Sequence, residues 1–227
     1  MRTIFEAGFD IVYLSFVIIV GIYMIVKSGN NKQYKLFGVM SLTLGLGDSF
    51  HLIPRIFALV ANDFSKYAVY LGYGKLITSI TMTLFYLILY YIYLIRYSKE
   101  KSLKITVTMV LLGVIRIALC FLPGNDWTSL TPPVVYGIIR NIPFAIMGII
   151  VICLYFVASR KYKDRALYNV YLSVIFSFGF YIPVVLWAHV YPIIGALMIP
   201  KTIAYAYIVM LLFKEFRKCP KTSTNFS

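Results

Sequence analysis

Long apolar runs dominate the chain, and short polar segments separate them. A transmembrane helix needs about 20 mostly apolar residues to cross the roughly 30 Å hydrocarbon core of a bilayer. Seven runs reach that length, which predicts an all-α, polytopic membrane protein with seven transmembrane helices. The predicted spans are residues 4–26, 36–56, 68–95, 103–122, 132–157, 166–189 and 193–214. They make residues 1–214 one transmembrane domain and residues 215–227 a basic cytoplasmic tail.

The composition agrees with a membrane domain. Charged residues make up only 13% of the chain and hydrophobic residues 61%, whereas soluble domains carry roughly 25% charged residues. Glu6 and Asp10 interrupt the first apolar run, so we expect this run to be retained rather than removed as a signal peptide. The formal net charge of +14 is better explained by membrane orientation than by a nucleic-acid partner.

The basic residues fall mainly on one side of the predicted helices. Cytoplasmic connections of membrane proteins carry an excess of Lys and Arg. Fifteen of the 22 basic residues follow the first, third, fifth and seventh spans. They are Lys27, Lys32, Lys35, Arg96, Lys99, Lys101, Lys104, Arg160, Lys161, Lys163, Arg165, Lys214, Arg217, Lys218 and Lys221. This distribution predicts an extracellular N-terminus and a cytoplasmic C-terminus, and we expect the plasma membrane as the location.

The order of some features suggests an internal repeat. The second span ends with His51 and Pro54, and the sixth ends with His189 and Pro192. The third and seventh spans each carry a lysine in their outer half. A parallel 3+1+3 duplication, with residues 103–122 as the linker, would produce this order. Chance similarity among apolar helices is the alternative.

Ionisable residues within the spans gather toward the predicted outer side. Such groups are expensive in a bilayer and usually face the bundle interior or a water-filled cavity. The acidic ones are Glu6, Asp10 and Asp48, and the basic ones are Arg55, Lys75, Arg116, Arg140 and Lys201. The excess of cations suits an outward-facing pocket for a phosphate, a carboxylate or an anionic lipid head group. A structural network of ion pairs, with long side chains reaching the interface, is the alternative.

The sharpest local motif runs from Gly47 to Arg55 and contains Asp48 and His51. The positions 48, 51 and 55 are spaced i, i+3 and i+7, so they project from one helix face. A carboxylate beside an imidazole can orient it as a general base or proton relay. In the alternative interpretation, Asp48 pairs with Arg140 or Lys201 instead.

Further residues complete the expected pocket. Asn141 and His189 are candidates to line it, and Gly45 and Gly47 are expected to permit close helix contact. Asp48 and His51 could ligate a metal only with a third ligand such as His189 or Asp10. Because the chain has only 2 histidines, a histidine-rich zinc site is excluded, and we predict no metal.

The layout of seven spans with an external N-terminus resembles that of rhodopsins and of the SWEET sugar transporters. Lys201 is similar to a retinal-binding lysine, but Pro192 lies only nine residues before it, which is too close for the two to meet at one retinal level. We therefore predict no cofactor. The Gly-Leu-Gly-Asp stretch ending at Asp48 is similar to the Gly-Asp of lysoplasmalogenase-type hydrolases, whose second acidic site has no counterpart here.

These observations support two principal hypotheses. In the first, the protein binds and transports a small anionic or amphipathic solute, with Asp48 and His51 coupling protons. In the second, it is an intramembrane hydrolase or transferase that acts on an outer-leaflet lipid with His51 as the base. A membrane sensor or receptor component is a third alternative. Membrane lipids are expected partners in each case, and the sequence gives no oligomeric state.

Overall fold

The computed structural model describes the backbone of residues 2–218 and the side chains of residues 5–191 and 193–218. Within that range no strand is present, and seven helices are long and apolar enough to span a membrane. This confirms the predicted all-α class. The helices are α1 (Arg2–Lys27), α2 (Lys32–Ala61), α3 (Ala68–Arg96), α4 (Leu103–Cys120), α5 (Val134–Lys161), α6 (Val170–Trp187) and α7 (Met198–Lys218). Short 3-10 segments are η1 (Ser98–Glu100), η2 (Pro123–Asn125) and η3 (Pro192–Leu197).

Asparagines set both ends of α2 and make it longer than predicted. The Asn31 side chain accepts a hydrogen bond from the backbone N–H of Tyr34 at 3.2 Å, and such a cap favours a helix start at Lys32. At the other end Asn62 adopts a left-handed backbone with φ of 51°, a conformation that commonly ends helices. The helix therefore continues to Ala61, whereas the sequence predicted an end at residue 56.

The start of α6 also differs from the prediction. The Asp164 carboxylate accepts hydrogen bonds from the backbone N–H groups of Ala166 and Leu167, at 3.0 and 3.4 Å. These bonds stabilise a turn in place of the predicted helix start at residue 166. The helix begins at Val170.

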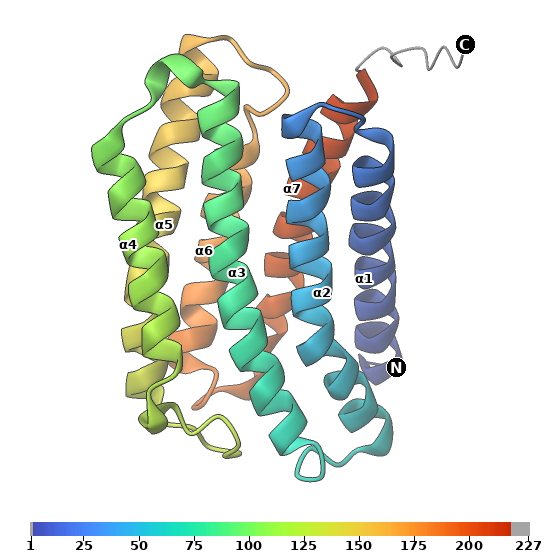
Figure 1. The fold of residues 1–227 in the computed structure, drawn as a ribbon. Helices are drawn as coiled ribbons and strands as arrows, with labels where there is room; N and C mark the ends of the chain where they lie inside the picture. Colours follow the sequence, from blue (N-terminus) through green and yellow to red (C-terminus); the bar gives the residue numbers. More distant parts are fainter. Residues whose placement is uncertain (1, 219–227) are drawn as a thin grey trace.

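The seven helices run alternately up and down, and neighbours in sequence pack side by side (Figure 1). Helix α7 closes the bundle by contacting α1 and α2, and α3 also contacts α5. The start of α1 and the α2–α3, α4–α5 and α6–α7 connections lie at one end, which we call the N-side. The other connections and the end of α7 lie at the opposite end, the C-side.

Glycines allow α2 to pack closely against both of its neighbours, as the sequence predicted for Gly45 and Gly47. A Cβ atom at Gly45 would lie 2.7 Å from Cγ2 of Val17 in α1, and one at Gly47 would overlap Thr81 in α3. The Thr78 hydroxyl donates to the Gly47 carbonyl at 3.0 Å. Small residues of this kind let helix backbones approach each other in membrane proteins.

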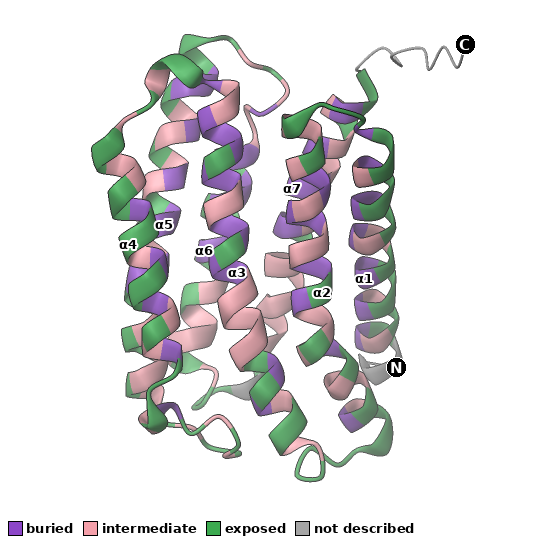
Figure 2. Ribbon diagram, viewed as in Figure 1, coloured by how far each residue is buried: buried purple, intermediate pink, exposed green. Residues whose placement is uncertain are grey.

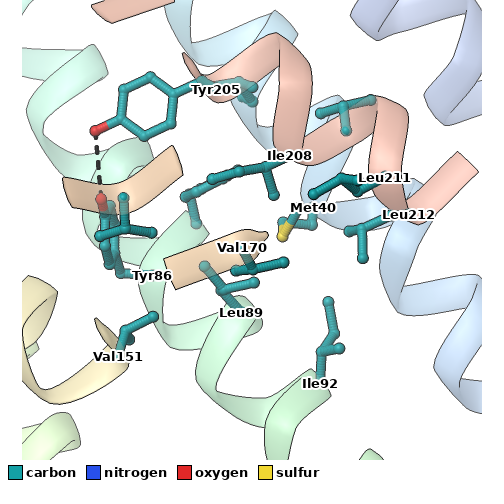
Figure 3. Packing of buried hydrophobic residues seen from close by; sticks show 14 of the residues in the cluster. Met40, Tyr86, Leu89, Ile92, Val151, Val170, Tyr205, Ile208, Leu211 and Leu212 are labelled. Atoms are coloured by element: carbon teal, nitrogen blue, oxygen red, sulfur yellow. Dashed lines mark hydrogen bonds between the residues drawn. The ribbon is translucent and has the colours of Figure 1, made fainter. Parts of the chain in front are cut away.

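The two halves of the bundle are packed differently. Most fully buried side chains lie in the C-side half, where Leu89, Val151 and Ile208 belong to one apolar core (Figures 2 and 3). In the N-side half, every residue of 76–81 in α3 and of 194–202 in η3 and α7 is half-buried. Six consecutive helical residues point in all directions around the helix axis. The residues on the inward face of α3 are therefore only half-buried in this part of the bundle.

Candidate functional site

Three cations from three helices interact with one tyrosine in the N-side half, and a fourth cation interacts with one of these three. Lys201 Nζ lies 4.3 Å from the centre of the Tyr181 ring, and Arg116 and Arg140 interact electrostatically with the same residue. Lys75 interacts with Arg140. We call Lys75, Arg116, Arg140 and Lys201 the cationic cluster. In the described part of the chain, none of them lies within 4.0 Å of a carboxylate oxygen.

Arg116 is the most deeply buried member, with only 2% of its surface exposed. The buried residues of α4 are Met109, Gly113, Arg116 and Cys120, a spacing that places all four on the inward face of the helix. The Arg116 Cζ atom lies 3.4 Å from the centre of the Phe144 ring. The Nε and Nη1 atoms have no hydrogen-bond partner among the described residues. Cation–π contact therefore replaces an ion pair here.

The α4–α5 connection holds Arg140 in place. The Arg140 Nη1 atom donates to Asn125 Oδ1 at 2.7 Å, and its Cζ lies 4.3 Å from the Trp127 ring centre. Asn125 in turn donates to the carbonyl of Leu119, and Trp127 Nε1 to that of Cys120, at 2.8 and 2.9 Å. These carbonyls belong to the last turn of α4 and lack helical partners. One set of side chains thus caps a helix and positions a cation.

Tyr181 and Asn141 connect the cationic cluster with an apolar groove. The Tyr181 hydroxyl donates to Asn141 Oδ1 at 3.2 Å, and Asn141 Nδ2 donates to the Gly137 carbonyl at 2.8 Å. Both side chains line a groove with a volume of about 140 Å³ between residues 138–145 of α5 and 178–186 of α6. The other lining residues are apolar. The groove surface is thus almost entirely apolar, and Tyr181 links it to the cations.

The acidic residues lie apart from the cationic cluster, on α1 and α2. Asp48 Oδ2 accepts a hydrogen bond from the Tyr13 hydroxyl at 2.7 Å. Arg55 Nη2 and Glu6 Oε2 form an ion pair at 2.9 Å. Asp10 is buried and interacts electrostatically with Arg55. Apart from Arg55, the positive groups of the N-side half are thus separated from the negative ones, although Lys201 is close enough to Asp48 to interact with it.

The two histidines occupy different environments. His51 is close to Lys75 and to the backbone of Leu71, and its Nδ1 atom has no hydrogen-bond partner within residues 2–218. Within the described residues, no hydrogen bond joins His51 and Asp48, because the Asp48 carboxylate is directed to Tyr13 of α1. His189 is exposed in the turn after α6, and the described structure places none of the other candidates in contact with it.

Several residues of the site carried no signal in the sequence. Tyr13, Phe144 and Tyr181 contact the charged groups directly, but the chain has 20 Tyr and 17 Phe residues. Asn125 lies in a predicted loop, where Asn is common. The only available signal for it was its position next to the uncapped end of a helix.

A second charged cluster closes the C-side and was not predicted. Arg96 binds both Asp164 and Glu215 at 2.8 Å, and the Tyr97 hydroxyl donates to Asp164 at 2.8 Å. We call these four residues the C-side clasp, because they join α3, the α5–α6 connection and α7. Burial disfavours the charged form of Asp164, but hydrogen bonds from Arg96 and Tyr97 outweigh it and hold the pKa of this carboxyl below its ordinary value.

Together these features define a class: an all-α, multi-pass membrane protein with segregated charges inside one half of the bundle. In residues 2–218, no group of three or more His, Cys, Asp or Glu side chains could hold a metal ion. No protein-family model, curated protein or solved structure matches the chain.

Proposed function

We propose that this chain is a plasma-membrane protein that binds and transports a small anionic or amphipathic solute through a pocket open to the N-side. The observation that carries the proposal is the buried guanidinium of Arg116, which lacks a carboxylate partner within the described chain. An uncompensated buried charge is unfavourable, and an anionic ligand would supply the missing partner. Arg140 and Lys201 add positive charge next to it, and Lys75 adds more at the exposed rim.

The proposed orientation has the N-side outside the cell. The C-side carries most of the basic residues, including Lys27, Lys101 and Lys163 in its connections. An excess of Lys and Arg is typical of cytoplasmic loops. In this orientation the cationic cluster receives solute from the extracellular side.

Transport, rather than binding alone, is supported by the difference between the two halves of the bundle. The N-side half is incompletely packed, whereas the C-side half has a buried apolar core and the C-side clasp. A protein that opens alternately to each side would have this arrangement when it is open outward. Opening inward would require the clasp to separate.

Proton coupling is proposed to involve Asp48 and His51. Asp48 lies between the Tyr13 hydroxyl and the positive field of Lys201. An anion bound to Lys201 would cancel that field and favour the protonated form of Asp48. Binding of anion and proton would then support each other. His51, with its unpartnered Nδ1 atom, is the second group that could carry a proton.

The direct test is anion binding by purified protein in a neutral detergent, measured by calorimetry with inorganic phosphate and acetate. Arg116→Gln is expected to weaken binding roughly 10- to 100-fold, because hydrogen bonds to charged groups contribute about 1.5–3 kcal/mol. Arg55→Gln is the control. It removes a cation from the same half of the bundle, but one already paired with Glu6, so the affinity should change less than about twofold.

Transport is then tested in proteoliposomes that contain a pH indicator. The wild-type protein should move the anion that it binds, with accompanying proton movement that is lost in Asp48→Asn. Equal weakening of binding by Arg116→Gln and Arg55→Gln would contradict the proposed site. Proton flux that is independent of every anion would contradict coupled transport.

A second candidate is an enzyme that acts on an outer-leaflet lipid, and the groove between α5 and α6 supports it by offering lateral access. The absence of a hydrogen bond from Asp48 to His51 among the described residues weakens it, since His51 then lacks an orienting carboxylate. Incubation with lipids and mass spectrometry distinguish the two. Products that disappear in His51→Ala would favour the enzyme.

A further inference from the structure

We infer that the ligand of the cationic cluster is a single-chain anionic amphipath, whose alkyl chain lies in the α5–α6 groove and whose head group contacts Arg116 and Lys201. The inference rests on the proposed function and makes it specific. It follows from three properties of the groove: its lining, its closed end and its charged neighbour.

The lining of the groove is suited to hydrocarbon. Ile142 and Ala145 contribute apolar surface from α5, and Ile182 and Val185 from α6. Ile142 and Ile182 are 53% and 46% exposed, so the groove opens on the outer surface of the bundle. A lipid chain can therefore reach it sideways without crossing water.

The groove is closed toward the C-side. Gly148 of α5 faces the ring of Phe178 so closely that a Cβ atom at this position would overlap it. Phe178 also packs against Phe144, with ring centres 5.1 Å apart. A chain in the groove would therefore end at this aromatic floor, with its other end directed to the N-side. Pro143 and Pro183 each remove a helical hydrogen bond beside the groove.

The inner wall of the groove leads to positive charge. Tyr181 lines the groove and also lies under Lys201, 4.3 Å from ring centre to Nζ. Arg116 interacts electrostatically with the same tyrosine. A ligand with its chain in the groove can therefore place its head group beside both cations by displacing the bond between Tyr181 and Asn141. Its head must be anionic, and the planar guanidinium suits either a carboxylate or a phosphate.

The test compares ligands that differ only in chain or in charge. Dodecyl phosphate and dodecanoate are titrated into the protein in a neutral maltoside detergent, beside inorganic phosphate and acetate. The chain-bearing anions should bind roughly tenfold or more tightly than their chainless counterparts, because the chain buries apolar surface. Dodecyltrimethylammonium has the same chain and the opposite charge, and it should not compete. Comparing the affinities for dodecyl phosphate and dodecanoate identifies the preferred head group.

Filling the groove should remove only the contribution of the chain. Ala145→Phe places a ring in the groove and should lower the affinity for dodecyl phosphate roughly tenfold, while phosphate binding stays within about twofold of wild type. Ala118→Phe is the matched control, since Ala118 is exposed on α4 outside the groove. Val185→Phe fills the groove from α6 and replaces the first variant if that one does not fold.

The outcomes separate the inference from the function on which it rests. If phosphate binds and the alkyl chain adds nothing, the inference is wrong and the anion site stands. If no anion binds, with or without a chain, both are wrong. If groove-filling variants change the oligomeric state in light scattering and leave dodecyl phosphate affinity unchanged, the groove is an interface between copies of this chain, which overturns the inference.

Discussion

Arg116 shows how one residue can have opposite effects on stability and function. Its guanidinium contacts the Phe144 ring, and two of its nitrogens lack partners in the described structure. Removing such a charge relieves an unfavourable burial, whereas removing a paired charge leaves its partner uncompensated. The chain offers both cases, since Arg96 is bound by two carboxylates.

We therefore expect Arg116→Met to leave the melting temperature of the unliganded protein unchanged or to raise it, by a stability gain of order 1 kcal/mol. Arg96→Met should lower it. At the same anion concentration, the melting temperature should rise more for the wild type than for Arg116→Met. Thermal unfolding in detergent, monitored by circular dichroism, measures all three. A lower melting temperature for Arg116→Met without ligand would indicate a structural role for this arginine.

The predictability of single residues depended on how rare they are in a membrane span. Lys75, Arg140 and Lys201 stood out because charge inside an apolar run demands an explanation. Tyr181 is equally central to the site. It could not be predicted, because tyrosines flanked by apolar residues are common in this chain. The orientation of Asp48 could not be predicted either, because residues spaced i and i+3 share a face and can still turn to different neighbouring helices.

At the level of helices, α2 is the element most constrained by its neighbours. Gly45 faces α1, and Gly47 faces α3. Hydropathy identified this span, but its length followed from Asn31 and Asn62, whose capping roles depend on backbone conformation rather than on apolar content. The presence of each span could therefore be predicted from the sequence, whereas the residues at which the helices begin and end could not.

The close packing of α2 yields a matched pair of substitutions. Gly47→Ala should destabilise the protein by about 1–3 kcal/mol, because its Cβ would overlap Thr81. Gly179→Ala should be neutral or stabilise by up to about 1 kcal/mol, since that glycine has open space around it and alanine favours helix. Unfolding of both variants in the same detergent provides the comparison. Equal stability would show that α2 and α3 can separate without penalty.

At the level of the whole molecule, the two ends of the bundle differ in how charge is compensated. The C-side clasp pairs its charges across three elements, and the half-buried Glu100 adds a further contact to Lys161 and Tyr162. Hydrogen bonds from these two residues lower the pKa of Glu100. The C-side cations could be counted in the sequence and were used to predict the orientation of the chain in the membrane. Their partners could not be predicted, because Asp164 and Glu215 are far from Arg96 along the chain.

The clasp predicts a dependence of stability on pH. The folded-state pKa of Asp164 is below its ordinary value, so its stabilising contribution is complete above pH about 5 and is lost as the pH falls through the lowered pKa. Asp164→Asn should therefore have a lower melting temperature at neutral pH and a smaller decrease between about pH 5 and 3. Melting curves across this range test it. Parallel pH profiles for the two proteins would exclude Asp164 as the responsible group.

The uncompensated positive charge of the cationic cluster also has an electrical consequence. Moving one elementary charge through a membrane potential of 100 mV changes the free energy by about 2.3 kcal/mol. If the cluster changes its access from one side to the other, an empty site would feel this potential as a cation, and a site filled by an anion without an accompanying proton would feel it less. An inside-negative potential would then pull the empty site inward more strongly than a site that holds an anion alone. The voltage, as much as the solute gradient, would decide in which direction the protein works, and potassium diffusion potentials imposed on proteoliposomes would reveal it.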